Sequence, residues 1–393
     1  MITIEYLKKS IIQAINNRNS NCSELINRAI EFYYNSKYRE VLLILNEVKR
    51  VITHHDLYYF EAIIYSYLGN NIEVIESCKK GLELKETYYL YNRIAISYDD
   101  LNEYDLAIEM FDKAIKIDKS IFELYYGKAV ILVDLCRYNE AIHLFNIVIS
   151  INPNYSKAYY QKGYSLFKLK EYNQAFELYK KYVNLTNDED GYYYLSLILF
   201  ESKYGDINTI EDKYEEALLY IEKAISIMDK KNKFESCYLS LKADILFMLD
   251  RDKEAKFCYS TVINNEKSDI NDLEEAYASL SFYLVNNNRK LALEYINKAL
   301  MITRESWYLN LKGRILYKLK NYDESIKILN EVLNNKNKFN KDLDLELEDT
   351  YHYLSLNYFR NGNLKSALDF IKKAISVKNE EKFINFMNYL KKK

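Results

Sequence analysis

Pairs of residues twelve positions apart, most of them small, recur along the chain, and this spacing constrains the fold more than any other feature of the sequence. The first five pairs start 33 or 34 residues apart. Three positions after the first member comes an aromatic residue or Leu, and turn residues such as Gly69-Asn70-Asn71 separate the two members. The pairs are Ala29/Val41, Ala62/Val74, Ala95/Ala107, Ala129/Ala141, Gly163/Ala175, Ala243/Ala255, Leu280/Ala292, Gly313/Ser325 and Ser355/Ala367, with a stretched copy in which Ser196 or Leu197 precedes Ala217.

Each copy shows the apolar periodicity of a helix on both sides of its turn, which predicts two antiparallel helices per copy. The paired residues fall where the two helices cross, because a large side chain there would force the helices apart. With only eight Gly and one Pro in 393 residues, the chain has few residues that interrupt helices. The sequence therefore predicts an all-α chain of stacked helix pairs.

These copies resemble the tetratricopeptide repeat (TPR), about ten of them over residues 22–377. The family closes its repeat with a Pro, which occurs here once, and the first two copies carry Val in place of Ala. The resemblance implies a right-handed α–α superhelical solenoid of helix-turn-helix repeats with terminal capping helices. The residues that carry it are Tyr125, Ala129, Leu132, Ala141, Phe145 and Pro153 in one copy, and Tyr91, Ala95, Tyr98, Ala107, Phe111 and Ala114 in the copy before it.

The repeats divide the chain into four expected segments. Residues 1–20 form an N-terminal capping helix, 22–189 hold repeats 1–5, 190–378 hold repeats 6–10, and 379–393 form a C-terminal capping helix. The end segments are interpreted as caps because each has one apolar stripe at helical spacing, although a docking helix for another protein is an alternative. The stripes are Ile4, Leu7, Ile11 and Ile15 at one end and Phe383, Phe386, Met387 and Leu390 at the other.

Two stretches break the rhythm of the repeats. An insertion near 201–216 separates the two helices of the sixth copy, and a long link at 334–349 precedes the tenth. Insertions in solenoids map to loops, so both are expected to be surface loops. A hinge or a partner-specific lip is the alternative.

The bulk composition favours a soluble cytosolic protein with no membrane insertion. The 55 basic and 57 acidic residues nearly cancel, which argues against a polyanionic partner such as nucleic acid. The five cysteines have no C-x-x-C spacing, as expected for free thiols in a reducing compartment. The N-terminus lacks the features of a signal peptide, and no run of about 18 apolar residues is present.

No set of residues predicts catalysis, a cofactor or a metal. The run His54-His55-Asp56 contains metal-ligand types, but adjacent residues on a helix point about 100° apart. The acidic run 187–191 lacks the spacing of a calcium loop. Gly-rich phosphate loops and nucleophile motifs are also missing from the sequence. We therefore expect a protein that is not an enzyme.

The resemblance implies that the first helices of the repeats line a concave face on which partner peptides lie. The inward positions lie six and three residues before the first residue of a pair, and one, four and five residues after it. Aromatic side chains there suit peptide binding, and we expect them to face solvent. The candidate partner-binding residues are Tyr59, Tyr67, Tyr89, Asn92, Asp99, Asp100, Tyr126, Asp134, Lys157, Tyr160, Tyr164, Lys168, Trp307 and Arg314.

Four of these residues, Tyr59, Tyr126, Tyr160 and Tyr164, would form a tyrosine ladder with acids on one side and lysines on the other. The alternative is that the 41 tyrosines reflect nucleotide bias in the genome rather than a binding surface. The clamp with which some TPR proteins hold chaperone C-termini needs Lys and Asn, then Asn, then Lys and Arg in three consecutive copies. No such set occurs here.

The leading function is a non-enzymatic interaction scaffold that binds a peptide or protein segment in the groove. A peptide-responsive conformational switch is the alternative, with the insertion near 201–216 as its pivot. An RNA-binding helical repeat is disfavoured by the near-zero net charge, and an enzyme by the missing catalytic sets. The sequence specifies neither the partner nor the oligomeric state.

Overall fold

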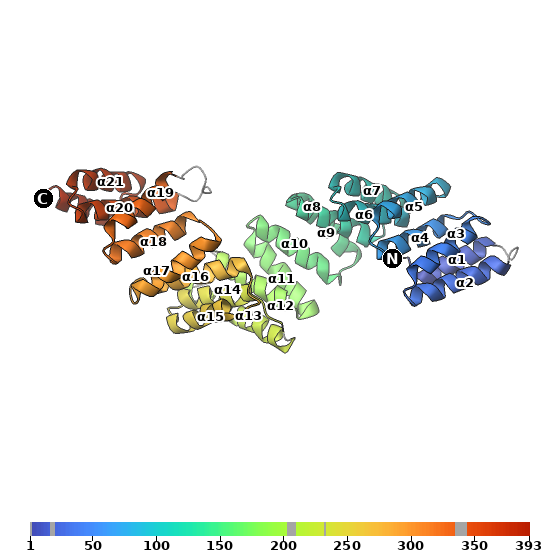
Figure 1. Cartoon of the computed structure of the whole chain (residues 1–393). Coiled ribbons are helices and arrows are strands. Elements are labelled where there is room, and N and C mark those ends of the chain that lie inside the picture. The colour runs from blue at the N-terminus through green and yellow to red at the C-terminus, as the bar shows by residue number, and fades with distance from the viewer. Residues whose placement is uncertain (1, 16–19, 203–209, 232, 335–343) are drawn as a thin grey trace. The chain divides into compact units, whose positions relative to one another are not determined.

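The computed structural model describes residues 2–15, 20–202, 210–231, 233–334 and 344–393, and every regular element in these ranges is a helix. The helices belong to two compact units, Met1–Asn187 and Asp188–Lys393. Within each unit consecutive helices pack against each other in chain order (Figure 1). The predicted all-α fold of stacked helix pairs is thereby confirmed. None of the described helices combines the length and apolar character needed to cross a membrane.

The first unit starts with a single helix, α1, and continues with helix pairs. In each pair the two helices pack against each other, and the second then packs against the first helix of the next pair. The helices are α1 (Ile4–Ile15), α2 (Ser20–Tyr34), α3 (Tyr38–Lys49), α4 (His55–Tyr67), α5 (Asn71–Leu84), α6 (Tyr88–Asp100), α7 (Tyr104–Ile117), α8 (Phe122–Asp134), α9 (Tyr138–Ile151), α10 (Ser156–Lys168) and α11 (Tyr172–Thr186).

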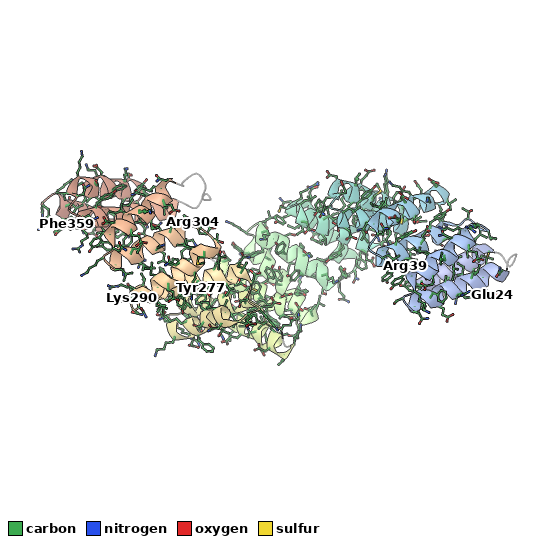
Figure 2. The ribbon with its side chains drawn as sticks, viewed as in Figure 1. Glu24, Arg39, Tyr277, Lys290, Arg304 and Phe359 are labelled. Carbon is green, nitrogen blue, oxygen red and sulfur yellow. The ribbon has the colours of Figure 1, made fainter. Side chains whose placement is uncertain are left out.

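The second unit repeats this plan and ends with a single helix, α22. Side chains from neighbouring helices fill the space between them in both units (Figure 2). The helices are α12 (Glu189–Glu201), α13 (Ile210–Lys230), α14 (Ser236–Met248), α15 (Asp252–Asn264), α16 (Ile270–Leu284), α17 (Arg289–Ile302), α18 (Ser306–Lys318), α19 (Tyr322–Asn334), α20 (Asp344–Arg360), α21 (Leu364–Val377) and α22 (Glu381–Leu390).

The two single helices lie at the outer ends of the repeats. Helix α1 packs against α2 and α4 and buries Leu7, Ile11 and Ile15 of the predicted stripe. Helix α22 packs against α21 and buries Phe383 and Leu390. These contacts fit capping, which stays a prediction together with the proposed segment boundaries.

The two irregular stretches of the sequence lie partly outside the described residues. Of the insertion near 201–216, residues 203–209 are not described and residues 210–216 belong to α13. Of the link at 334–349, residues 335–343 are not described and residues 344–349 begin α20. Part of each stretch is therefore helical rather than loop.

The paired small residues meet where the two helices of a repeat cross. Ser325 Oγ donates to the backbone carbonyl oxygen of Gly313 at 2.7 Å. Only one side-chain hydroxyl therefore separates the backbones of the two helices at this point. A Cβ atom added at Gly313 would lie 2.5 Å from a methyl carbon of Leu329. In the tenth repeat, Ser355 Oγ donates to the backbone carbonyl oxygen of Ala367 at 2.6 Å. Small side chains are needed at these positions because larger ones would separate the helices.

A hydrogen bond of the same kind shows which residue is the first of the pair in the eighth repeat. Ser281 Oγ donates to the carbonyl oxygen of Ala292 at 2.8 Å, and Ser281 is fully buried. The first residue of this pair is therefore Ser281, eleven positions before Ala292. The prediction of Leu280 is wrong by one residue, because the spacing of twelve does not hold in this repeat. In the sixth repeat the corresponding bond, from Ser196 to Ala217, selects Ser196 over Leu197.

The turns within the repeats share one backbone conformation. In the fourth repeat Cys136 has a φ of 57° and its N–H donates to Val133, while the N–H of Arg137 donates to Leu132 at 2.8 Å. This arrangement is a Schellman motif, which satisfies carbonyl groups at the end of the first helix. In most repeats the residue seven positions after the first small residue has a positive φ, as Cys136 does. Only Gly69 and Gly362 among these residues are glycines.

A buried carboxylate at the start of the second unit predicts a measurable pH dependence of stability. Burial alone would raise the pKa of Glu189, but hydrogen bonds from Lys231, from its own backbone N–H and from Lys233 outweigh burial and lower it from 4.5 to about 2. The folded state therefore binds fewer protons than the unfolded state. The stabilisation is complete above about pH 4.5 and is lost as the pH falls toward 2.

We expect Glu189→Gln to lower the free energy of unfolding by about 1–3 kcal/mol at pH 7, because it removes charge-assisted hydrogen bonds. Urea denaturation of wild type and variant from pH 7 down to pH 3 tests this. The difference between the two proteins should shrink at the acidic end. A difference that is independent of pH would contradict the assigned ion pairs.

Candidate functional site

The first helices of neighbouring repeats form one wall of each unit. Beyond the contacts between consecutive helices, α6 packs against α8, α8 against α10, α14 against α16, and α18 against α20. Helices that approach each other most closely in a curved stack lie on its inner side. We call this surface the first-helix wall, and all of the sequence-predicted binding residues lie on its helices.

Two of the predicted tyrosines are inside the protein rather than on the wall. Tyr59 is 2% exposed and Tyr89 is 6% exposed, and their rings pack edge to face at 4.8 Å. The guanidinium of Arg93 lies 5.7 Å from the centre of the Tyr59 ring. The expectation that these two side chains face solvent is wrong, because neighbouring helices cover them.

The other tyrosines of the predicted ladder are half-buried. Tyr126 packs against Phe145 of its own repeat and against Tyr155, and burial raises its pKa to about 12. Tyr160 packs against two rings of α11, Tyr179 at 5.6 Å and Tyr182 at 5.2 Å. These side chains therefore stabilise the packing of α8 and α10 as well as contributing surface, which corrects the expectation of a fully solvated ladder.

The predicted acids of the first unit lie close enough to affect each other. Burial raises the pKa of Asp99, and the charges of Asp134 and Asp100 raise it further. Asp100 and Asp134 are exposed. The structure thus gathers the three acids that the sequence placed beside the tyrosines.

The remaining predicted residues of the first unit are spread along its wall. Tyr67 is exposed and stacks on Tyr38 at 5.0 Å, and Asn92 is half-buried. Lys157 and Lys168 are exposed, and the Lys168 ammonium lies 5.3 Å from the centre of the half-buried Tyr164 ring. These contacts do not gather the residues around one cavity.

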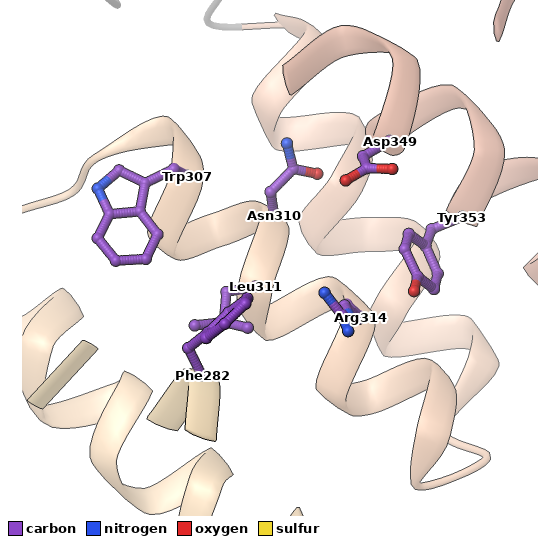
Figure 3. A pocket seen from close by; sticks show the side chains of 7 residues that line it. All are labelled: Phe282, Trp307, Asn310, Leu311, Arg314, Asp349 and Tyr353. Carbon is purple, nitrogen blue, oxygen red and sulfur yellow. The ribbon is translucent and has the colours of Figure 1, made fainter. Parts of the chain in front are cut away.

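A pocket of about 160 Å³ opens on the first-helix wall of the second unit. Helix α18 forms its centre, with α16 on one side and α20 on the other (Figure 3). Trp307 lies at one end and Tyr353 at the other (Figure 3). The lining residues are Phe282, Trp307, Asn310, Leu311, Arg314, Asp349 and Tyr353.

One part of the pocket is apolar and aromatic. Trp307 is 37% exposed and its ring packs at 4.4 Å on that of the buried Tyr308. Phe282 is 40% exposed, and Leu311 is buried. Large aromatic side chains that are held by packing and still partly exposed are typical anchors of protein interfaces.

The polar part of the pocket contains an arginine with an N–H donor that has no acceptor among the described residues. The Arg314 guanidinium lies 5.7 Å from the centre of the Phe282 ring, and its buried Nε has no hydrogen-bond partner among the described residues. A buried donor without an acceptor costs about 1–3 kcal/mol. A shift of the Arg314 side chain that brought this donor to a ligand oxygen would recover that energy.

Acidic and amide groups complete the rim of the pocket. Thr350 Oγ1 donates to Asn310 Oδ1 at 2.9 Å, which fixes the orientation of the amide. Asp349 is exposed at the start of α20. Burial raises the pKa of Tyr353 despite the opposing charge of Arg314, so its hydroxyl stays protonated and able to donate. The pocket offers hydrogen bonds and apolar contact, which are means of recognition.

Of the pocket residues, the sequence selected Trp307 and Arg314 as candidates and reached Asn310 by its inward position. It missed Phe282, Leu311, Asp349 and Tyr353. Phe282 directly follows Ser281 as Arg314 follows Gly313, so the register error in the eighth repeat hid it. Asp349 lies six residues before Ser355, the spacing that selected Trp307, and could have been found by extending the rule to the tenth repeat. Tyr353 lies at no position of the rule.

Sequence models described as "Tetratricopeptide repeat" match the chain at residues 88–120, 122–155, 156–189 and 303–380. The matches fall in both units and coincide with the helix pairs of the structure. The matched residues therefore form tetratricopeptide repeats, and the similar helix pairs in the rest of the described chain are consistent with a protein of many such repeats.

Two curated relatives match part of the chain. A TPR repeat-containing protein of Methanocaldococcus jannaschii is 26% identical over 226 residues, which cover 45% of this chain and 38% of the relative. The Hsp70-Hsp90 organising protein of Plasmodium falciparum is 29% identical over 99 residues, which cover 23% of this chain and 18% of the relative. The chain therefore spans well under half the length of each.

Among solved structures, the C-terminal part of a TPR repeat-containing protein from Cytophaga hutchinsonii is similar with a TM-score of 0.52. It is 16% identical, and the match covers 63% of this chain and 98% of that one. This likeness concerns the fold alone.

Proposed function

We propose that the protein is an interaction scaffold that binds a segment of another protein in the pocket between α16, α18 and α20. The observation that carries the proposal is Arg314, whose buried Nε lacks an acceptor among the described residues while its guanidinium lies beside the partly exposed Phe282 ring. A stack of similar helix pairs holds such side chains in place before the ligand arrives, which lowers the entropic cost of binding. The Hsp70-Hsp90 organising protein, a relative over 99 residues, is named for organising other proteins, which agrees with this class of function.

The pocket suits a segment with a bulky apolar side chain next to a carboxylate. The apolar side chain would lie between Trp307 and Phe282, where it loses water against aromatic surface. The carboxylate would accept from Arg314, because a planar guanidinium binds carboxylates with paired hydrogen bonds. Asp349 at the rim would favour a basic or amide group further along the segment.

A peptide display selection on the full chain tests the proposal. The library is first depleted on a chain carrying both Trp307→Ala and Arg314→Glu, and the remaining peptides are selected on wild type. We expect peptides that share a bulky apolar residue beside Asp or Glu, and that bind wild type but not the double variant in fluorescence anisotropy.

Circular dichroism of the double variant provides the control for folding, since Trp307 and Arg314 are both partly exposed. Peptides that bind both proteins equally would place the binding surface elsewhere. A selection that returns no common sequence would also argue against this pocket.

A further inference from the structure

Three residues of metal-ligand type meet at the start of α4 in the first unit. The ligand atoms of His54, His55 and Asp56 all lie within 4.8 Å of one another. His55 Nε2 is 3.6 Å and His54 Nδ1 is 3.8 Å from the carboxylate oxygens of Asp56. The helical argument against a metal fails here, because His54 precedes the helix in extended conformation, with φ −146° and ψ 138°.

These separations are close to those of a transition-metal site. Tetrahedral zinc binds His nitrogen and carboxylate oxygen at about 2.0–2.2 Å, which puts neighbouring ligand atoms roughly 3.4 Å apart. The two imidazole–carboxylate distances are already within a few tenths of an ångström of that value, and side-chain rotation would have to close the widest separation, at most 4.8 Å, by about 1.4 Å. Two imidazoles with one carboxylate are a common zinc donor set.

The carboxylate at this site has no lysine or arginine ion-pair partner among the described residues. Asp56 is fully buried, and the two imidazoles are the only ion-pair partners it has among the described residues. Buried charges are normally paired or bind metals. A divalent cation would give the Asp56 carboxylate a direct ionic partner.

Neighbouring helices hold Asp56 in position. The Tyr89 hydroxyl on α6 donates to Asp56 Oδ1 at 2.6 Å, and the Ser10 hydroxyl on α1 donates to Oδ2. Donors of this kind orient metal-binding carboxylates. The backbone N–H of Asp56 also donates to His54 Nδ1 at 3.3 Å, a long bond that a metal would replace.

Two positive charges near the site lower its expected affinity for a cation. The positive charge of Lys85 acts on both imidazoles, and the N-terminal end of α4 carries a partial positive charge. We expect weaker binding than at a zinc site with four protein ligands.

We propose that His54, His55 and Asp56 form a zinc site, in which the two imidazoles and the carboxylate bind the ion and water takes the fourth position. Water can reach it because the His54 side chain is 22% exposed. The ion would fasten α4 to α1 and α6 through Ser10 and Tyr89. The site is separate from the proposed binding pocket, which lies in the other unit.

Isothermal titration of the full chain with ZnCl₂ tests this site. The background carries Cys136→Ser, since Cys136 is the exposed cysteine among the described residues and its thiol would bind zinc on its own. We expect one zinc per chain, with affinity reduced more than about 100-fold in His54→Ala and in His55→Ala, because even second-sphere changes cost 10–100-fold. His143→Ala, which removes an exposed histidine on α9, should bind as the background does.

Two further measurements keep the result interpretable if a histidine variant unfolds. Zinc X-ray absorption of the background protein should show nitrogen and oxygen neighbours and no sulfur. Tyr89→Phe removes only the hydroxyl that orients Asp56, and we expect it to lower zinc affinity about 10–100-fold. Absence of zinc binding, zinc–sulfur contacts, or full affinity in folded His54→Ala and His55→Ala chains would overturn the site.

Discussion

Replacing Trp307 by Ala is expected to weaken binding of a pocket-selected peptide by about 30-fold or more, which corresponds to about 2 kcal/mol. Trp307 is a partly exposed aromatic side chain that packs on Tyr308 and forms one end of the pocket. Its removal takes away the largest apolar surface that a ligand could cover there. Fluorescence anisotropy with a labelled peptide measures the loss.

Phe257→Ala is the matched control for this prediction. Phe257 is 74% exposed on α15, a second helix of its repeat, so it is an aromatic residue of similar size on the other side of the helix pair. We expect unchanged peptide affinity in this variant. Equal losses from Trp307→Ala and Phe257→Ala would mean that exposed aromatic residues bind the peptide without regard to the pocket.

Enlarging a residue at a helix crossing is expected to destabilise the first unit by about 1–3 kcal/mol. Ala141 on α9 is fully buried and belongs to one core cluster with Ala129 and Phe145. Leu at this position adds volume where α8 and α9 are closest, and the close-packed neighbours have no room to move aside. Urea denaturation followed by circular dichroism at the helix signal measures the change.

Asn146→Leu on the same helix provides the comparison. Asn146 is exposed, so the same new side chain there should change stability by no more than about 0.5 kcal/mol. If Ala141→Leu were as stable as Asn146→Leu, small size would not be what the crossing positions require.

The helix pairs could be predicted because their cause is local and repeated. Spacing, apolar periodicity and turn residues recur in most copies, so a departure in one copy does not change the fold. The register of the eighth repeat could not be predicted from spacing, because Ser281 is chosen by a hydrogen bond to Ala292 that no periodicity reveals. The conformation of His54, which decides whether it can join His55, also depends on where α4 begins.

The candidate site was predicted only in part. The inward positions of α18 include Trp307 and Arg314, which line the pocket, because repeat geometry fixes which side of a helix faces the wall; that they bind a partner stays a prediction. The same rule placed Tyr59 and Tyr89 on the surface, but specific neighbours bury them. Tyr89 donates to Asp56 of the preceding repeat, a contact between residues 33 positions apart that composition cannot indicate.

Photo-crosslinking of a selected peptide tests most directly whether a protein segment binds this pocket. A photoreactive group replaces the bulky apolar residue of the peptide, and the crosslinked residues of the chain are identified by mass spectrometry. We predict crosslinks to α16 and α18, at Phe282 and Trp307. Crosslinks to the second helices α17 and α19, or to the first unit, would contradict the proposed binding site.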